Sequence, residues 1–294
     1  MKWKLDFISE ENFTKHIQAY IEKYGENLES FDVVRFNKNI IDPIKLIFDK
    51  TVYRSTWDEI ISSEIFRQRD KSNNNDIGYF HQRIFQYIDN CRVPDAGWDV
   101  IFESEKGIDI TGNGDIKHMI YVEMKNKHNT MNSSSASHTY NKMRNQVMDD
   151  DDCACFLVEA IAKKSQNIVW ETTIKKEKKR HNLIRKVSID KFYAIVTGQD
   201  DAFFQMCMIL PEIIEKVVKS GEITKMPKDE VKENLQSIAN YFDVKQESLA
   251  TSMAVYMLGF SDYAGFSELL KNDDDLASKN KLRRIYEYAK NLNL

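Results

Sequence analysis

Apolar side chains recur at helical spacing along the first third of the chain. In residues 8–25 they fall three or four positions apart, and Ser9 is a suitable N-cap for the predicted helix. The same spacing predicts further helices at 43–50, 55–70 and 78–87. The polar run Lys71–Asn75 predicts a break between the last two.

After Gly97 the apolar side chains recur at every second position, as in a strand. Residues 98–103 and 120–125 are predicted strands, and the glycine-containing segment 107–118 between them predicts the end of a long hairpin. The other elements predicted in this region are a helix at 137–148, a buried strand at 153–158, and a short strand leading into a helix at 187–197.

This mixture of helices and strands indicates an α/β fold with a mixed central sheet flanked by helices. From residue 222 onward the pattern is almost wholly helical. We therefore expect a main domain at 1–221, with a helical N-terminal part, and a helical extension or subdomain at 222–294.

Composition narrows the class of protein. The chain has 294 residues, 42% of them hydrophobic, which is enough for a sizeable core. The net charge of −4 does not by itself indicate a nucleic-acid partner. The four cysteines form no CxxC pair, so we expect reduced thiols rather than a zinc site. No signal peptide or membrane span is recognisable, so we expect a cytoplasmic protein.

The candidate chemistry lies on the two predicted strands at 98–103 and 120–125. Because side chains alternate along a strand, Glu123 and Lys125 share one face, and the apolar residues between them point to the core. Asp99 holds a matching position on the neighbouring strand. Two adjacent strands can therefore bring Asp99, Glu123 and Lys125 into one cluster.

Such a cluster suits the hydrolysis of a phosphodiester. Carboxylate oxygens bind Mg²⁺, which takes one or two protein carboxylates and keeps several waters. Asp99 and Glu123 are the predicted ligands, with the backbone carbonyl of Met124 as a further one. Lys125 would stabilise the attacking hydroxide and contact the scissile phosphate.

An isolated E-x-K is a weak signal, because an exposed strand edge often carries Glu and Lys. The pattern gains weight from Asp99, which stands 24 positions before Glu123. Together they resemble the D…E-x-K pattern of the PD-(D/E)xK nuclease superfamily. Pro94-Asp95 is the literal match to its proline-aspartate pair, but we prefer Asp99 because it lies in the predicted strand. Asp95 and Asp109 are the alternatives.

Longer segments are similar to a group of type II restriction endonucleases, named after the Sau-ninety-six-I and Eco-forty-seven-II enzymes. They include VEMKNKHNTMNSSS, DKSNNNDIGYFHQRIF upstream and VSIDKFYAIVTG downstream, within residues 30–215. The resemblance implies an endonuclease domain at 1–221. It also implies a homodimer that cuts double-stranded DNA at a palindrome of the GGNCC or GGWCC type, leaving 5′-phosphate and 3′-hydroxyl ends. A cognate DNA methyltransferase would belong to the same restriction-modification system without forming a stable complex.

The same resemblance assigns individual residues. Asp99 and Glu123 become the Mg²⁺ ligands and Lys125 the catalytic lysine. Glu64 resembles an additional acid that many of these nucleases carry upstream. The alternative for Glu64 is an ordinary solvated helix face.

Two segments are predicted to contact DNA. The first follows the E-x-K strand and is rich in small hydrogen-bonding side chains. Its candidate residues are Asn126, Lys127, His128, Asn129, Asn132, Ser133, Ser134 and Ser135. The second is the stretch 163–191, which has ten basic and three acidic residues. Its leading candidates are Lys178, Lys179 and Arg180. A flexible polar loop and a solvated basic face are the respective alternatives.

Two other functions remain open from the sequence. One is a repair or structure-specific nuclease of the same superfamily, and the other is a non-catalytic DNA-binding protein with this fold. Cleavage of a plasmid into discrete fragments would separate the restriction endonuclease from both.

Overall fold

The computed structural model describes residues 3–39, 41–220, 228–241 and 247–260. The chain forms two compact units. Unit 1 comprises Met1–Tyr24 and Asn74–Ile223, and unit 2 comprises Gly25–Asn73 and Thr224–Leu294. The expected boundary at residue 221 lies close to the later boundary between the units, but Gly25–Asn73 belongs with the C-terminal part.

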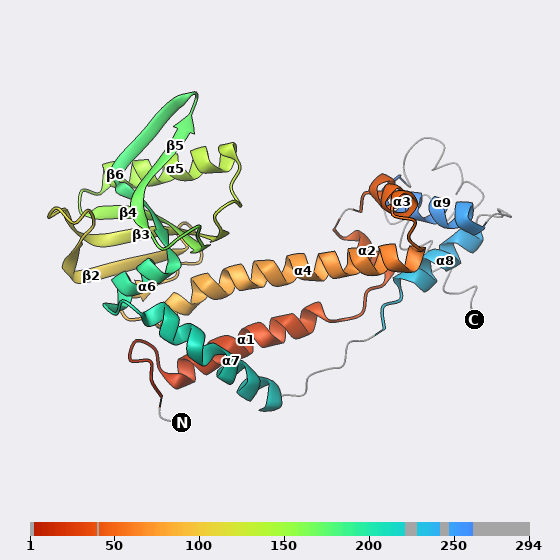
Figure 1. Cartoon of the computed structure of the whole chain (residues 1–294), viewed down its shortest axis with the longest axis horizontal. Helices are drawn as coiled ribbons and strands as arrows, with labels where there is room; N and C mark the ends of the chain where they lie inside the picture. The colour runs from red at the N-terminus through yellow and green to blue at the C-terminus, as the bar shows by residue number, and fades with distance from the viewer. Residues whose placement is uncertain (1–2, 40, 221–227, 242–246, 261–294) are drawn as a thin grey trace. The chain divides into compact units, whose positions relative to one another are not determined.

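Unit 1 is built on a six-stranded mixed sheet, as predicted (Figure 1). The strand order is β1-β2-β3-β4-β6-β5. β3 pairs with β4 and β4 with β6 in parallel, whereas the β1–β2, β2–β3 and β5–β6 pairs are antiparallel. The strands are β1 (Cys91–Arg92), β2 (Val100–Asp109), β3 (Ile116–Lys127), β4 (Cys153–Ile161), β5 (Asn167–Ile174) and β6 (Glu177–Ser188).

Helices cover both faces of this sheet. On one face α5 (Ser133–Asp149) packs Tyr140 and Met143 against Cys155 and Leu157. On the other face a larger apolar core includes the inward side chains of β2, β3 and β4. The helices that contribute to this larger core are α1 (Glu10–Asn27), the end of α4 (Trp57–Arg83), η1 (Ile84–Tyr87), α6 (Ile189–Thr197) and α7 (Ala202–Ser220).

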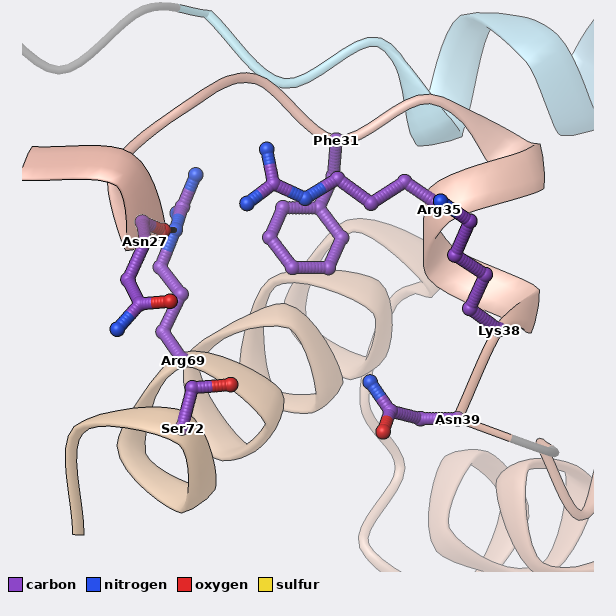
Figure 2. Close-up of a pocket in the computed structure, with 7 residues that line it drawn as sticks. All are labelled: Asn27, Phe31, Arg35, Lys38, Asn39, Arg69 and Ser72. Atoms are coloured by element: carbon purple, nitrogen blue, oxygen red, sulfur yellow. Dashed lines mark hydrogen bonds between the residues drawn. The ribbon is translucent and has the colours of Figure 1, made fainter. Parts of the chain in front are cut away.

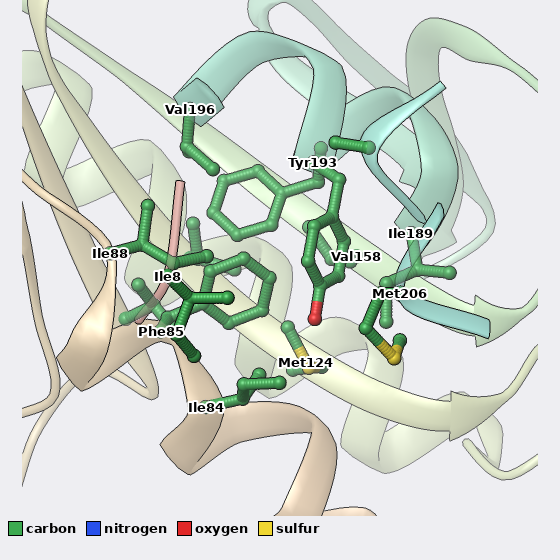
Figure 3. Packing of buried hydrophobic residues seen from close by; sticks show 14 of the residues in the cluster. Ile8, Ile84, Phe85, Ile88, Met124, Val158, Ile189, Tyr193, Val196 and Met206 are labelled. Carbon is green, nitrogen blue, oxygen red and sulfur yellow. The ribbon is translucent and has the colours of Figure 1, made fainter. Parts of the chain in front are cut away.

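The larger core fixes the strand that carries the E-x-K motif. Met124 on β3 and Val158 on β4 point into it and lie among side chains such as Phe85 and Tyr193 (Figure 3). All four side chains are buried. Because strand side chains alternate, burying Met124 on this face places Glu123 and Lys125 on the opposite face.

Unit 2 is helical in the part that the structure describes. Its separate apolar core includes Phe31, Phe36, Ile61, Leu235 and Val255. The helices are α2 (Val33–Asn37), α3 (Pro43–Val52), the first part of α4, α8 (Val231–Tyr241) and α9 (Glu247–Phe260). Helices were expected in 222–294, and α8 and α9 lie there; 221–227, 242–246 and 261–294 are outside the described residues.

The predicted break at Lys71–Asn75 is wrong, because this run lies inside α4. The run contains neither Gly nor Pro, and asparagine lowers helix stability by at most ~0.7 kcal/mol relative to alanine. Side-chain bonding opposes even this cost, since Asn73 Oδ1 accepts a 2.9 Å hydrogen bond from Asn27 Nδ2.

Other boundaries differ from expectation by a few residues. β2 begins at Val100 rather than Trp98, and α5 begins at Ser133 rather than Ser137. Asn132 explains the second difference, because its side chain caps the helix by accepting a 2.8 Å bond from the Ser135 N–H. Ser133, Ser134 and Ser135 therefore form the first turn of a helix instead of a loop.

The hairpin formed by β5 and β6 was not predicted from the pattern. Its two turn residues, Lys175 and Lys176, both have positive φ, at 50° and 69°. That conformation is typical of a type I′ turn, which usually contains Asn-Gly. A Lys-Lys pair gives no such signal.

The four cysteines are free, as expected. Within the described residues, no helix combines the length and the apolar character needed to cross a membrane.

Candidate active site

Asp99 lies directly before β2 and continues its pairing with β3. Its N–H donates to the Val122 carbonyl at 3.0 Å. The antiparallel register pairs the next residue, Val100, with Val122, and Glu123 lies close enough for its carboxylate to interact with that of Asp99. The carboxylate is held in place by the Met124 N–H, which donates to Asp99 Oδ2 at 2.7 Å. The structure thus places Asp99 beside the E-x-K strand, as expected.

Glu123 and Lys125 point to the same face of β3. Their neighbours Val122 and Met124 are buried in the larger core on the other face. Lys125 Nζ lies 3.6 Å from Glu123 Oε2, and the side chains are 30% and 14% exposed, respectively. The predicted trio of Asp99, Glu123 and Lys125 therefore forms one cluster at the same end of the sheet.

Lys142 is a fourth member that the sequence interpretation missed. It projects from α5, and its ammonium donates to Glu123 Oε1 and to the carbonyl of Gly97. Its Nζ also lies 3.9 Å from the ring centroid of Trp98. No spacing rule links Lys142 to Glu123, since the two meet only when α5 packs on the sheet.

Glu159 and Lys186 form a buried ion pair next to the cluster. Glu159 on β4 is the register partner of Lys125 on β3, and it is 2% exposed. Lys186 Nζ on β6 lies 2.8 Å from Glu159 Oε1. Because Leu157 and Glu159 share a face with Glu123 and Lys125, this pair extends the polar end of that face across three strands.

The electrostatics of Asp99 indicate a site that favours a cation. Burial raises the pKa of Asp99 above its ordinary value, and the neighbouring Glu123 carboxylate raises it further. The Met124 N–H opposes these effects, as do Lys125 and Lys142. Two close carboxylates in a partly buried position are stabilised by a positive charge between them.

The donor set fits magnesium better than zinc. Among the described residues, no group of three or more His, Cys, Asp or Glu side chains could hold a metal ion. Two carboxylates with a backbone carbonyl nevertheless suffice for Mg²⁺, which retains water ligands. The Met124 carbonyl is available from the strand that carries Glu123.

The alternative aspartates have different surroundings. Asp95 is exposed in the loop before Gly97. Asp109 lies at the far end of the β2–β3 hairpin, where it accepts backbone N–H bonds from Gly112 and Gly114, each at 2.9 Å. These turn bonds, led by Gly114, lower the pKa of Asp109. Neither residue has the contact to Met124 that Asp99 has.

Glu64 belongs to unit 2, whereas the trio belongs to unit 1. It is buried rather than on a solvated helix face. Its carboxylate accepts hydrogen bonds from Arg67, with Nε at 2.7 Å, and from Gln68 Nε2 at 3.2 Å. The assignment of Glu64 as an additional active-site acid stays a prediction.

The predicted DNA-contacting segment lies between the end of β3 and the first turn of α5. Asn126 is partly buried and bonds the Asn74 carbonyl at 3.5 Å, and the His128 N–H donates to the Ile161 carbonyl at 3.1 Å. The remaining candidates are exposed at the surface: Lys127, Asn129, Asn132, Ser133, Ser134 and Ser135.

The basic candidates lie on the β5–β6 hairpin. Alternation places Lys178 and Arg180 on one face and Lys179 on the other. Arg180 lies 3.5 Å from Glu171 across the hairpin, and Lys179 pairs with Glu177 at 2.5 Å. Two other basic residues of the stretch, Arg185 and Lys186, are bonded to Asn167 and Glu159 within the sheet.

A separate pocket of about 160 Å³ lies in unit 2 (Figure 2). Arg35 and Arg69 lie over the Phe31 ring, at 4.7 and 5.1 Å from its centroid. Arg69 bonds both oxygens of Asp229, and Arg35 pairs with Glu29. Both guanidinium groups are therefore engaged in holding this unit together. The lining residues are Asn27, Phe31, Arg35, Lys38, Asn39, Arg69 and Ser72.

The sequence of the region that contains the cluster is similar to the sequences of known proteins. The family described as Eco47II restriction endonuclease matches residues 5–219. The chain is 28% identical over 229 residues to the type II restriction enzyme Sau96I of Staphylococcus aureus, a match that spans 75% of this chain and 84% of that enzyme. It is 25% identical over 226 residues to the type II restriction enzyme Eco47II of Escherichia coli, spanning 73% of this chain and 88% of that enzyme.

Proposed function

Because the chain belongs to the Eco47II restriction endonuclease family, we propose that it is a type II restriction endonuclease. It hydrolyses phosphodiester bonds of double-stranded DNA at a short palindrome of the GGNCC or GGWCC type, leaving 5′-phosphate and 3′-hydroxyl ends. The observation that carries the proposal is the cluster in which Asp99, directly before β2, accepts the Met124 N–H of β3 and interacts with Glu123, while Lys125 lies 3.6 Å from Glu123.

Asp99, Glu123 and the Met124 carbonyl are the residues that would hold Mg²⁺. The bound ion would supply Lewis-acid chemistry and lower the pKa of a coordinated water. The chain's own contribution is to hold the carboxylates in place: the Met124 N–H orients Asp99, and the buried Val122 and Met124 side chains fix the strand. Lys125 orients the water and contacts the scissile phosphate.

DNA is held near the cluster by the segment that links β3 to α5. The exposed Ser133 and Ser134 lie in the first turn of α5, and the N-terminus of a helix favours a phosphate. Lys127 and Asn129 are exposed at the end of β3 and directly after it. We expect these groups to set the register of DNA relative to Glu123.

The basic outer face of the β5–β6 hairpin adds a second contact to the DNA backbone. Replacing both Lys178 and Arg180 with alanine should weaken binding to any DNA sequence and reduce the salt dependence of log K by about 2, because each lost phosphate contact removes about 0.9. Replacing the exposed Lys4 and Lys15, outside the proposed contact surface, should leave the slope unchanged. An unchanged slope in the first variant would remove the hairpin from the DNA contact.

A homodimer follows from the palindrome. Two copies related by a twofold axis present one cluster to each strand of a symmetric site. We therefore expect the active species on DNA to contain two chains. A methyltransferase that protects the same sequence would act as a separate enzyme.

Incubation with plasmid and Mg²⁺ tests the function. We expect discrete fragments, with cut ends that map to one palindrome. Glu123→Ala should abolish cleavage while DNA binding persists in Ca²⁺, whereas Glu103→Ala, on the exposed part of β2, should cut normally. A smear or nicked circles would favour a repair or structure-specific nuclease, and binding without cutting would favour a non-catalytic protein. Full activity of Glu123→Ala would falsify the site.

A further inference from the structure

The ammonium group of Lys142 is surrounded by groups that stabilise a cation. They are the Glu123 carboxylate, the Gly97 carbonyl and the face of the Trp98 ring. The side chain is 29% exposed, so the interaction is only partly screened by water. A lysine ammonium has three N–H donors and no acceptor, and here two of the donors are directed at oxygen atoms.

The position of Lys142 is fixed by packing rather than by chance. Tyr140 and Met143, on either side of it in α5, are buried against the sheet. Tyr140 also contacts Trp170 edge to face, with ring centroids 5.5 Å apart. The helix therefore cannot turn Lys142 away from Glu123 without losing this core.

The two oxygens of Glu123 are divided between two lysines. Lys142 binds Oε1, and Lys125 lies 3.6 Å from Oε2. With Asp99 opposite, the centre contains two carboxylates and two ammonium groups, so it is formally neutral without a metal. A divalent cation would add two positive charges at the same oxygens, and a DNA phosphate would compensate part of that excess.

We propose that Lys142 is the resident counter-cation of Glu123, which stabilises the centre in the absence of metal and competes with a divalent cation for the carboxylate. This role makes cation binding weak until DNA supplies negative charge. Lys142 is thus a positioning residue that couples the binding of the divalent cation to the binding of DNA. The proposal rests on the metal site included in the proposed function.

The test is Mn²⁺ binding to the full chain without DNA, measured by the electron paramagnetic resonance signal of free Mn²⁺. Lys142→Met keeps most of the aliphatic stem and removes the charge, and we expect it to bind Mn²⁺ at least tenfold more tightly than the unmodified chain. Lys142→Gln keeps a hydrogen-bond donor and should show the same change. Lys142→Arg should stay within about threefold, and so should the control Arg144→Met on the exposed side of α5.

The second measurement is thermal unfolding in the presence of a chelator. Lys142→Met should unfold at a lower temperature than the unmodified chain, and Mn²⁺ should reverse the difference. Unchanged or weaker Mn²⁺ binding in both neutral variants would overturn the inference.

Glu123→Gln separates this failure from that of the proposed metal site. If Glu123→Gln loses Mn²⁺ binding while the Lys142 variants do not gain it, only the role of Lys142 is refuted. If Glu123→Gln binds Mn²⁺ as the unmodified chain does, the metal site itself is wrong, and the inference fails with it.

Discussion

The buried pair of Glu159 and Lys186 allows a stability prediction whose size follows from the structure. Glu159 is 2% exposed, and Lys186 Nζ lies 2.8 Å from it. Replacing Lys186 with methionine preserves the packing of the stem but leaves a buried carboxylate without its partner. Breaking one side of a buried pair costs about 3–5 kcal/mol. We expect about 3 kcal/mol, because a quarter of the lysine side chain is exposed and water can approach.

The companion variant distinguishes lost charge pairing from general damage. Glu159→Gln should cost only about 1 kcal/mol, since an amide can still hydrogen-bond the ammonium. Adding Glu159→Gln to Lys186→Met should recover about 2 kcal/mol, because the unpaired charge is gone. Lys178→Met, on the exposed part of the same strand, should change stability by less than about 0.5 kcal/mol.

Urea unfolding monitored by tryptophan fluorescence measures these differences. Because the chain has two units, a single transition cannot be assumed. Trp57→Phe removes the tryptophan of unit 2 and leaves Trp3, Trp98 and Trp170 to report on unit 1. A cost below about 1 kcal/mol for Lys186→Met, or no recovery in the double variant, would refute the reasoning.

Three further predictions follow from single features of unit 1. Burial raises the pKa of Asp99, so the folded protein binds this proton more tightly than the unfolded chain and loses stability as pH rises above the ordinary value. In the presence of a chelator, Asp99→Asn should therefore be more stable than the unmodified chain at neutral pH, with a gain that shrinks as the pH falls; a gain independent of pH would contradict this. In the presence of Mg²⁺ the same variant should lose cleavage. Changing Lys175-Lys176 to Asn-Gly should stabilise the hairpin by about 1 kcal/mol in urea unfolding, because both positions have positive φ. Finally, the Tyr193 hydroxyl is buried without a hydrogen-bond partner in the described part of the chain, so Tyr193→Phe should leave the melting temperature unchanged or raise it, and a clear decrease would indicate a missed partner.

The features predicted from the sequence are those determined by local alternation. Val122 and Met124 had to face a core, so Glu123 and Lys125 had to face away from it, and the structure has this arrangement. Asp99 was expected in the neighbouring strand. It lies one residue before that strand, but its N–H still bonds the Val122 carbonyl of β3. The mixed sheet between helices was predicted from the mixture of helical and strand patterns along the chain, and it is confirmed.

Two features that the sequence did not predict, a continuous helix and a hairpin, depend on contacts between residues that the local sequence pattern does not encode. The continuous helix through Lys71–Asn75 survives a polar run because nothing in it breaks a helix, and Asn27 bonds to it from a distant position. The hairpin at Lys175 and Lys176 uses a turn conformation that lysine seldom adopts. In both places tertiary structure overrides a weak local preference.

The charges of the candidate site show the same division between local pattern and topology. A motif indicates the carboxylates, since Asp99 and Glu123 are recognised by their spacing. The cation that balances them besides Lys125 comes from elsewhere, because Lys142 projects from a helix packed on the sheet. Likewise Lys186, which balances the neighbouring Glu159, lies on a strand that is two positions away from β3 in the sheet. A cluster of acids in a partly dry position must be balanced if the protein is to fold without metal. Such compensating cations can therefore be located only after the fold is known, and the one found on α5 is Lys142, which we propose couples metal binding to stability.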